Sequence, residues 1–159
     1  MKKHLFSLLL LTYSIVAYSQ NYPDLDAYCG YITVEKDVMT GEATYKSPFD
    51  RSISFRKLVN NGVEVVYMRV SAVSKFKEKG GSVSIRFQKG YTIERKVATN
   101  FYKNLDGTFT HYAEFKLTKD DISKLKNYLI LECKVYMYNQ AIENNMQFKA
   151  YMHCLSKMH

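Results

Sequence analysis

The sequence predicts a mainly β domain of the α+β class. We expect an antiparallel meander that forms a sandwich or an open barrel, with a short helix before the last strand and a C-terminal helix. Two observations predict the sheet: apolar and polar residues alternate in short segments, and turn residues separate those segments. A third observation, the three- and four-residue spacing of apolar residues after Ile142, predicts the final helix.

The first 19 residues predict a cleavable secretory signal peptide. Lys2, Lys3 and His4 precede an apolar stretch from Leu5 to Ala17, and small residues occupy the −3 and −1 positions before a cut after Ser19. A cut after Gln20 is the alternative. The apolar stretch is shorter than the roughly 20 residues of a membrane-spanning helix. We therefore expect an exported protein (periplasmic, cell-surface or secreted) whose single β-rich domain covers residues 20–159.

The charge of the exported chain is moderately basic. Removing Lys2 and Lys3 from the 23 basic residues leaves 21 against 15 acidic residues, a net charge of +6. Such a charge favours acidic partners or simply keeps the protein in solution. No later segment is long and apolar enough to cross a membrane, so we expect no transmembrane segment in the mature chain.

The strands are predicted from residue 31 onward. Asn60-Asn61-Gly62 is a strong hairpin signal, and the segment 63–73 is apolar on both faces, which indicates a central strand. The other predicted strands are Tyr31 to Lys36, a strand headed by Ile53 and Phe55, Val83 to Phe87, Tyr91 to Val97, and Phe109 to Leu117. The short loops between them predict antiparallel neighbours, that is, a meander.

The C-terminal part contains two predicted helices and one more strand. Thr118 and Asp121 form a capping-box-like start for a helix over 119–126. A strand over 128–138 follows, and the second helix extends to Leu155.

Three cysteines remain after cleavage. Cys133 alternates in step with apolar residues of its strand, so we expect it in the core. Cys29 and Cys154 lie near the two ends of the mature chain, and a bridge between them would tie those ends together. Three unpaired thiols and other pairings are the alternatives.

Side chains with catalytic chemistry are few. His111 falls in register with apolar residues, which favours a buried imidazole bonded to a backbone carbonyl over a proton-transfer role. Asp120-Asp121 lies in the first turn of a predicted helix, where carboxylates offset the helix dipole. No metal or cofactor motif occurs, so we predict neither a metal nor a cofactor.

One predicted surface combines basic and aromatic side chains on the strands. Its members are Arg56, Arg86, Lys116, Lys134, Tyr112, Tyr136 and Tyr138. Basic groups beside aromatic rings on a sheet bind anionic ligands. Glutamates on the same faces also fit an ordinary solvated sheet with cross-strand charge pairs. Because an exported chain rarely meets nucleic acid, we predict no nucleic-acid partner.

Short motifs run through most of the mature chain. They are Val38-Met39-Thr40-Gly41, Tyr45-x-Ser47-Pro48-Phe49, Lys89-Gly90, Leu117-Thr118-Lys119-Asp120-Asp121, a Tyr-rich strand, Phe148 and Cys154-Leu155. In this order they resemble a group of small exported β-rich proteins of unknown function from Gram-negative bacteria. The resemblance implies a compact envelope or secreted domain and carries no activity.

Two functional hypotheses follow. The first is a non-catalytic exported binding module for a glycan, a peptide or a protein partner. The second is a small envelope hydrolase or lyase that uses His111 with a tyrosine. The sequence does not predict an oligomeric state.

Overall fold

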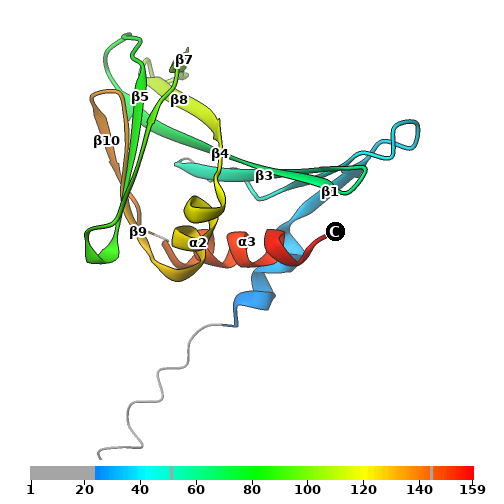
Figure 1. The fold of residues 1–159 in the computed structure, drawn as a ribbon. Helices are drawn as coiled ribbons and strands as arrows, with labels where there is room; N and C mark the ends of the chain where they lie inside the picture. The colour runs from blue at the N-terminus through cyan, green and yellow to red at the C-terminus, as the bar shows by residue number, and fades with distance from the viewer. Residues whose placement is uncertain (1–23, 51, 144) are drawn as a thin grey trace, which may run out of the picture.

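The computed structural model describes residues 24–50, 52–143 and 145–159. The predicted signal peptide and its cut lie outside the described residues. The chain forms ten strands, two α-helices and two short 3-10 helices in those ranges (Figure 1). In order they are η1 (Leu25–Tyr31), β1 (Thr33–Lys36), β2 (Ala43–Lys46), β3 (Ile53–Asn60), β4 (Val63–Ser74), β5 (Ser82–Phe87), η2 (Gln88–Gly90), β6 (Thr92–Lys96), β7 (Asn100–Lys103), β8 (Phe109–Lys116), α2 (Lys119–Asn127), β9 (Ile130–Val135), β10 (Tyr138–Ala141) and α3 (Asn145–Lys157).

The strands form two antiparallel sheets. A six-stranded sheet has the order β1-β2-β3-β4-β8-β7, and a four-stranded sheet has the order β10-β9-β5-β6. The predicted mainly β fold with a C-terminal helix is confirmed. β4 lies between β3 and β8, so the strand that is apolar on both faces is central, as its sequence indicates.

The meander is not continuous, because the chain changes sheets three times, the last time between β8 and β9. After β4 it enters the second sheet as the β5–β6 hairpin, and it then returns to the first sheet as the β7–β8 hairpin. The edge of β4 that does not contact β3 pairs with β8 rather than with β5. A turn signal such as Asn60-Asn61-Gly62 identifies a hairpin, but it carries no information on which sheet the hairpin joins.

The core lies between the two sheets and under the helices. Met68, Val70 and Ala72 of β4 are fully buried on one face of the six-stranded sheet. Ile85 and Cys133 are fully buried on the facing side of the four-stranded sheet. The predicted core position of Cys133 is therefore confirmed. α2 and α3 lie side by side beneath the six-stranded sheet (Figure 1).

The predicted strand over 128–138 is wrong at both ends. Ile130 is buried and Leu131 is exposed because the register with β5 shifts at a bulge, which reverses the alternation at the start of β9. Tyr136 has a φ of 56° and turns the chain back into β10. Tyr138 therefore pairs with Val135 and shares its inward face, although a straight strand would place Tyr138 outward.

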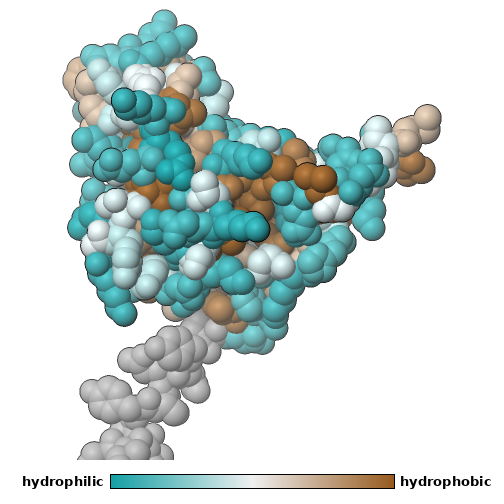
Figure 2. Space-filling view, in the orientation of Figure 1, coloured by the Kyte–Doolittle hydropathy of each residue, from teal (hydrophilic) through white to brown (hydrophobic). Residues whose placement is uncertain are grey.

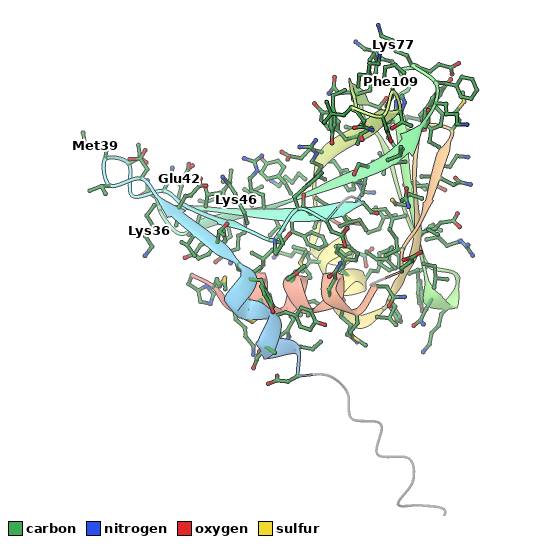
Figure 3. All side chains as sticks on the ribbon, turned by 180° about the vertical axis from the view of Figure 1, so that it is seen from behind. Lys36, Met39, Glu42, Lys46, Lys77 and Phe109 are labelled. Carbon is green, nitrogen blue, oxygen red and sulfur yellow. A yellow bond between two sulfur atoms is a disulfide. The ribbon has the colours of Figure 1, made fainter. Side chains whose placement is uncertain are left out.

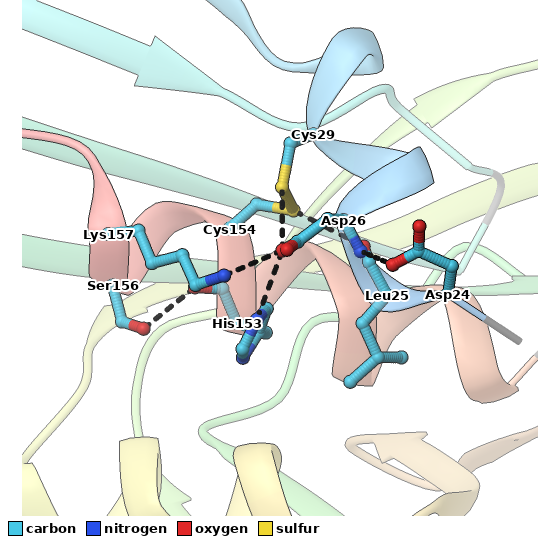
Figure 4. The surroundings of a disulfide bond; sticks show 8 residues. All are labelled: Asp24, Leu25, Asp26, Cys29, His153, Cys154, Ser156 and Lys157. Atoms are coloured by element: carbon cyan, nitrogen blue, oxygen red, sulfur yellow. Dashed lines mark hydrogen bonds and ion pairs between the residues drawn. A yellow bond between two sulfur atoms is a disulfide. The ribbon is translucent and has the colours of Figure 1, made fainter. Parts of the chain in front are cut away.

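The two ends of the described chain are tied together. Cys29 of η1 and Cys154 of α3 form the predicted disulfide (Figure 4). Asp26 accepts a hydrogen bond from Lys157 Nζ at 2.7 Å and lies 3.2 Å from His153 Nε2. The lysine holds the pKa of the Asp26 carboxyl below its usual value, with a smaller effect from the histidine.

The β1–β2 hairpin extends away from the rest of the molecule as an arm (Figure 1). We call residues 33–46 the arm. Within the described ranges, no helix combines the length and the apolar character needed to cross a membrane.

Candidate binding face

The structure divides the predicted basic and aromatic surface among three places. Arg56, Tyr112 and Lys116 lie on the outer face of the six-stranded sheet, opposite the buried face of β4. Arg86, Lys134 and Tyr136 belong to the outer side of the four-stranded sheet and its β9–β10 turn.

Tyr138 belongs to neither outer face. Its ring stacks on that of His111, with 4.3 Å between the ring centroids. The prediction that Tyr138 shares an exposed face with the basic residues is wrong, because the turn at Tyr136 reverses the direction of the chain.

The outer face of the six-stranded sheet carries an arginine–aromatic strip. We give this name to Phe49, Arg56, Tyr67, Arg69, Tyr112 and Glu114. The antiparallel register places Arg56 opposite Tyr67 and Arg69 opposite Glu114. Side chains directly opposite one another on one face of a sheet are close enough to interact.

Glu114 lies opposite Arg69 in the sheet, but its carboxylate pairs with Arg56. The Arg56 guanidinium lies 2.5 Å from Glu114 Oε1 and stacks on the Tyr67 ring, 4.8 Å from its centroid. Arg69, although directly opposite Glu114, instead stacks on Tyr112 at 4.0 Å and on Phe49 at 5.1 Å.

Arg69 therefore has a charge without a counterion. Within the described ranges it has no carboxylate at ion-pair distance, and its buried Nε has no hydrogen-bond partner. A guanidinium stacked on aromatic rings keeps its N–H donors at the edge of its plane, where they match the two oxygens of a carboxylate or a sulfate. The unused donors of Arg69 make this side chain the candidate anchor for an anion.

A pocket of about 520 Å³ adjoins the strip at the end of the sheet where β7 and β8 meet. We call it the end pocket. It is lined by Phe49, Val73, Tyr102, Asn104, Leu105, Asp106, Thr108 and Thr110. Its polar side chains bond to one another: Asn104 donates to Thr108, and Thr108 donates to Asp106. The surface left for a ligand is therefore mainly apolar.

The four-stranded sheet carries a second hollow of about 500 Å³ on its outer face. Ser82 and Ser84 form its floor because they are the small outward residues of β5, and the longer Lys96 and Lys134 rise on either side. Arg86 lies outside this hollow and is paired with Glu132 at 2.7 Å. Glu94 also lines the hollow, so basic and acidic groups alternate here.

His111 is sealed in the core. Its side chain is 1% exposed, and it lies against the rings of Tyr138 and Phe101. Its Nε2 is 2.8 Å from the carbonyl oxygen of Phe76, so the expected imidazole-to-carbonyl bond is confirmed. The hydrolase hypothesis requires His111 in a cleft beside an acid or a hydroxyl. Ser74 Oγ lies 3.4 Å from the ring, but the burial of His111 keeps a substrate away.

The other groups that could take part in chemistry are engaged elsewhere. Thr118 and Asp121 form the predicted capping box of α2, and Asp121 also pairs with Arg95. Burial raises the pKa of the Cys133 thiol to about 12. Across the described ranges, no group of three or more His, Cys, Asp or Glu side chains is arranged to hold a metal ion.

Comparisons with known proteins leave the geometry as the basis for a functional argument. No protein-family model, curated protein or solved structure matches this chain. The resemblance to small exported β-rich proteins stays a prediction.

Arg69, Phe49 and Tyr67 are the members of the strip that sequence reasoning missed. The segment 63–73 is apolar on both faces and therefore looks like a fully buried strand. This pattern conceals that Tyr67 and Arg69 point outward. The hairpin signal at Asn60-Asn61-Gly62 fixes the pairing of Arg56 with Tyr67, and extending that register by two residues finds Arg69. The contact with Phe49 depends on a loop and has no signal of this kind.

Proposed function

We propose that this protein is a non-catalytic, exported binding module that holds an acidic glycan on the arginine–aromatic strip. The observation that carries the proposal is the Arg69 guanidinium, which stacks on Phe49 and Tyr112 and has no carboxylate partner among the described residues. Its N–H donors fit a uronate carboxylate or a sulfate ester, and the neighbouring rings offer apolar faces for the C–H groups of a sugar ring.

The position of the strip favours a glycan over a peptide. Peptides that bind to sheets add a strand at a free edge, where main-chain groups are available. The strip lies mainly on β3, β4 and β8, and β3 and β4 are paired on both sides. A ligand on this face therefore meets side chains alone, which suits stacking on a sugar ring and ion pairing with its acid group.

Export and charge support the same ligand class. The Cys29–Cys154 disulfide is typical of an oxidising compartment outside the cytoplasm, where acidic polysaccharides occur. The net charge of +6 after cleavage attracts a polyanion over a longer range than Arg69 alone.

The test is calorimetric titration of the exported form of the protein with an oligogalacturonate and with its methyl-esterified, neutral counterpart. We expect binding of the acidic oligosaccharide alone, and weaker binding at high salt. Arg69→Gln should weaken binding roughly tenfold or more, as the loss of a charge-assisted hydrogen bond predicts.

Arg86→Gln is the matched control, because it removes the same charge from the other sheet, where Arg86 is already paired with Glu132. We expect it to change binding little. Equal binding of both oligosaccharides, or equal losses in the two variants, would contradict the proposal.

A further inference from the structure

The tip of the arm is an apolar surface that no other part of the described chain covers. Val38 and Met39 are 95% and 93% exposed. Met39 lies at the far end of the arm, well away from the body of the molecule (Figure 3). Figure 2 shows hydrophobic residues at this extremity, surrounded along the arm by hydrophilic ones.

The loop that presents these two side chains is firmly built. Asp37 Oδ1 accepts hydrogen bonds from the backbone N–H groups of Met39 and Thr40, at 2.8 and 3.3 Å. The Asp37 backbone pairs with Glu42 and Gly41, and Gly41 has a φ of 71°, which favours glycine. The hydrogen bonds from Met39 and Thr40 hold the pKa of the Asp37 carboxyl below its usual value. A preformed loop loses little conformational entropy when it binds.

The end pocket matches the tip in chemistry. Its exposed apolar side chains are Phe49, Val73, Tyr102 and Leu105, and its polar groups are already bonded to one another. An apolar plug fills such a pocket without leaving a polar group unpaired. The pocket lies at β7 and β8, and the arm lies at β1 and β2, so the two features occupy opposite ends of one sheet.

The two ends also carry opposite charge. The arm holds three acids, Glu35, Asp37 and Glu42, against Lys36 and Lys46. Near the pocket, the β4–β5 loop and the end of β7 hold four lysines, Lys75, Lys77, Lys79 and Lys103, against Glu78 and Asp106. Figure 3 shows Lys77 and Met39 at opposite extremities of the molecule. The arm of one copy is therefore attracted to the pocket end of another.

We propose that the Val38–Met39 tip of one copy inserts into the end pocket of a second copy, so that the protein associates head to tail. Each copy then keeps one free tip and one free pocket, and such a contact extends into open chains rather than closing as a two-fold dimer. Two side chains and the loop around them bury less than the roughly 1,200 Å² of a stable interface, so the association is weak and needs concentrated protein.

The excess of acids on the arm argues against an anionic membrane as its partner. Segments that bind acidic lipid carry clustered Lys and Arg, whereas here Lys46 is already paired with Glu35 at 2.7 Å. A second copy offers both the apolar pocket and the basic surroundings.

Sedimentation velocity of the exported protein over a wide concentration range tests this inference. We expect the average mass to rise with concentration for the wild type and for the control Val63→Ser, which changes an exposed apolar residue outside both surfaces. The tip variant Val38→Ser/Met39→Ser and the pocket variant Leu105→Glu should each stay monomeric. Circular dichroism checks that both variants fold.

Mixing the two defective variants gives the sharpest readout. The pocket variant keeps a working tip and the tip variant keeps a working pocket, so the mixture should form one-to-one dimers that grow no further. A wild type that stays monomeric, a tip variant that still associates, or a mixture without dimers would overturn the proposal. Binding of a monomeric wild type, but not of the tip variant, to vesicles of neutral lipid would assign the tip to a lipid surface instead.

Self-association and glycan binding fail independently in these experiments. Arg69 does not line the end pocket. Arg69→Gln should therefore weaken glycan binding and leave head-to-tail association unchanged, whereas the tip variant should lose association and keep glycan binding.

Discussion

The ammonium group of Lys57 lies 2.9 Å from the carboxylate of Glu64, and the lysine side chain is only 1% exposed. The same ammonium donates to the carbonyl oxygens of Met158 and Leu155, at 2.6 and 3.2 Å. Lys57 therefore joins β3 to the C-terminal end of α3, where unpaired carbonyls and the helix dipole favour a positive charge.

Glu64→Gln should lower the free energy of unfolding by about 1 kcal/mol. The glutamine keeps the shape of the side chain but removes the charge opposite the buried ammonium. The effect stays small because Glu64 is 40% exposed and solvent screens the pair. Urea unfolding near neutral pH measures it. Glu35→Gln, which breaks the more exposed pair with Lys46, is the control and should change stability less.

The pH dependence of that difference identifies its origin. The hydrogen bond from Lys57 holds the pKa of Glu64 below its ordinary 4.5, with a smaller effect from His159. A carboxyl with a lowered folded pKa stabilises the protein fully above the unfolded pKa and loses that contribution as the pH falls through the folded pKa. The stability difference between wild type and Glu64→Gln should therefore shrink below about pH 4.5. A difference that stays constant into acid would contradict this assignment.

Loss of the Cys29–Cys154 disulfide should lower the free energy of unfolding by about 2–5 kcal/mol. The bridge closes a loop across 125 residues and restricts the unfolded chain more than a short loop would. Urea unfolding of Cys29→Ser/Cys154→Ser against wild type measures the change. A reductant should weaken the wild type alone, and equal stability of the two proteins would count against a structural role for the bridge.

The sequence predicts the parts of this fold that depend on local patterns. Alternation and turn signals locate most strands, and the capping box at Thr118 marks the start of α2. Three strands, β2, β7 and β10, lie outside the predicted ones. β7 (Asn100–Lys103) has little alternation, and β2 (Ala43–Lys46) is short and depends on β1 and β3 for its pairing.

Features that depend on contacts between distant segments could not be predicted in this way. The period of β9 changes at a bulge, and the turn at Tyr136 moves Tyr138 from the expected outer face to the core. Among the described residues Arg69 has no carboxylate partner, because Arg56, on another strand, pairs with Glu114. The candidate site therefore depends on a competition between two arginines that no single segment reveals.

Cys133 should react with iodoacetamide only after unfolding. Its side chain is fully buried, and burial raises the pKa of the thiol to about 12, so the reactive thiolate is scarce at neutral pH. Mass spectrometry after labelling in the presence and absence of urea measures this, with the disulfide cysteines left oxidised. Rapid labelling without urea would mean that the sheets separate readily around β9.

Tyr138→Phe should leave the free energy of unfolding within about 1 kcal/mol of the wild type, or raise it. The ring of Tyr138 stacks on His111, but its buried hydroxyl has no hydrogen-bond partner within the described ranges. Removing an unpaired buried hydroxyl removes a desolvation cost and keeps the ring contact. Tyr138→Ala, which also removes the ring, is the contrasting variant and should lose several kcal/mol. A loss above about 2 kcal/mol in Tyr138→Phe would show that the hydroxyl has a polar partner, such as a buried water shared with His111 Nδ1.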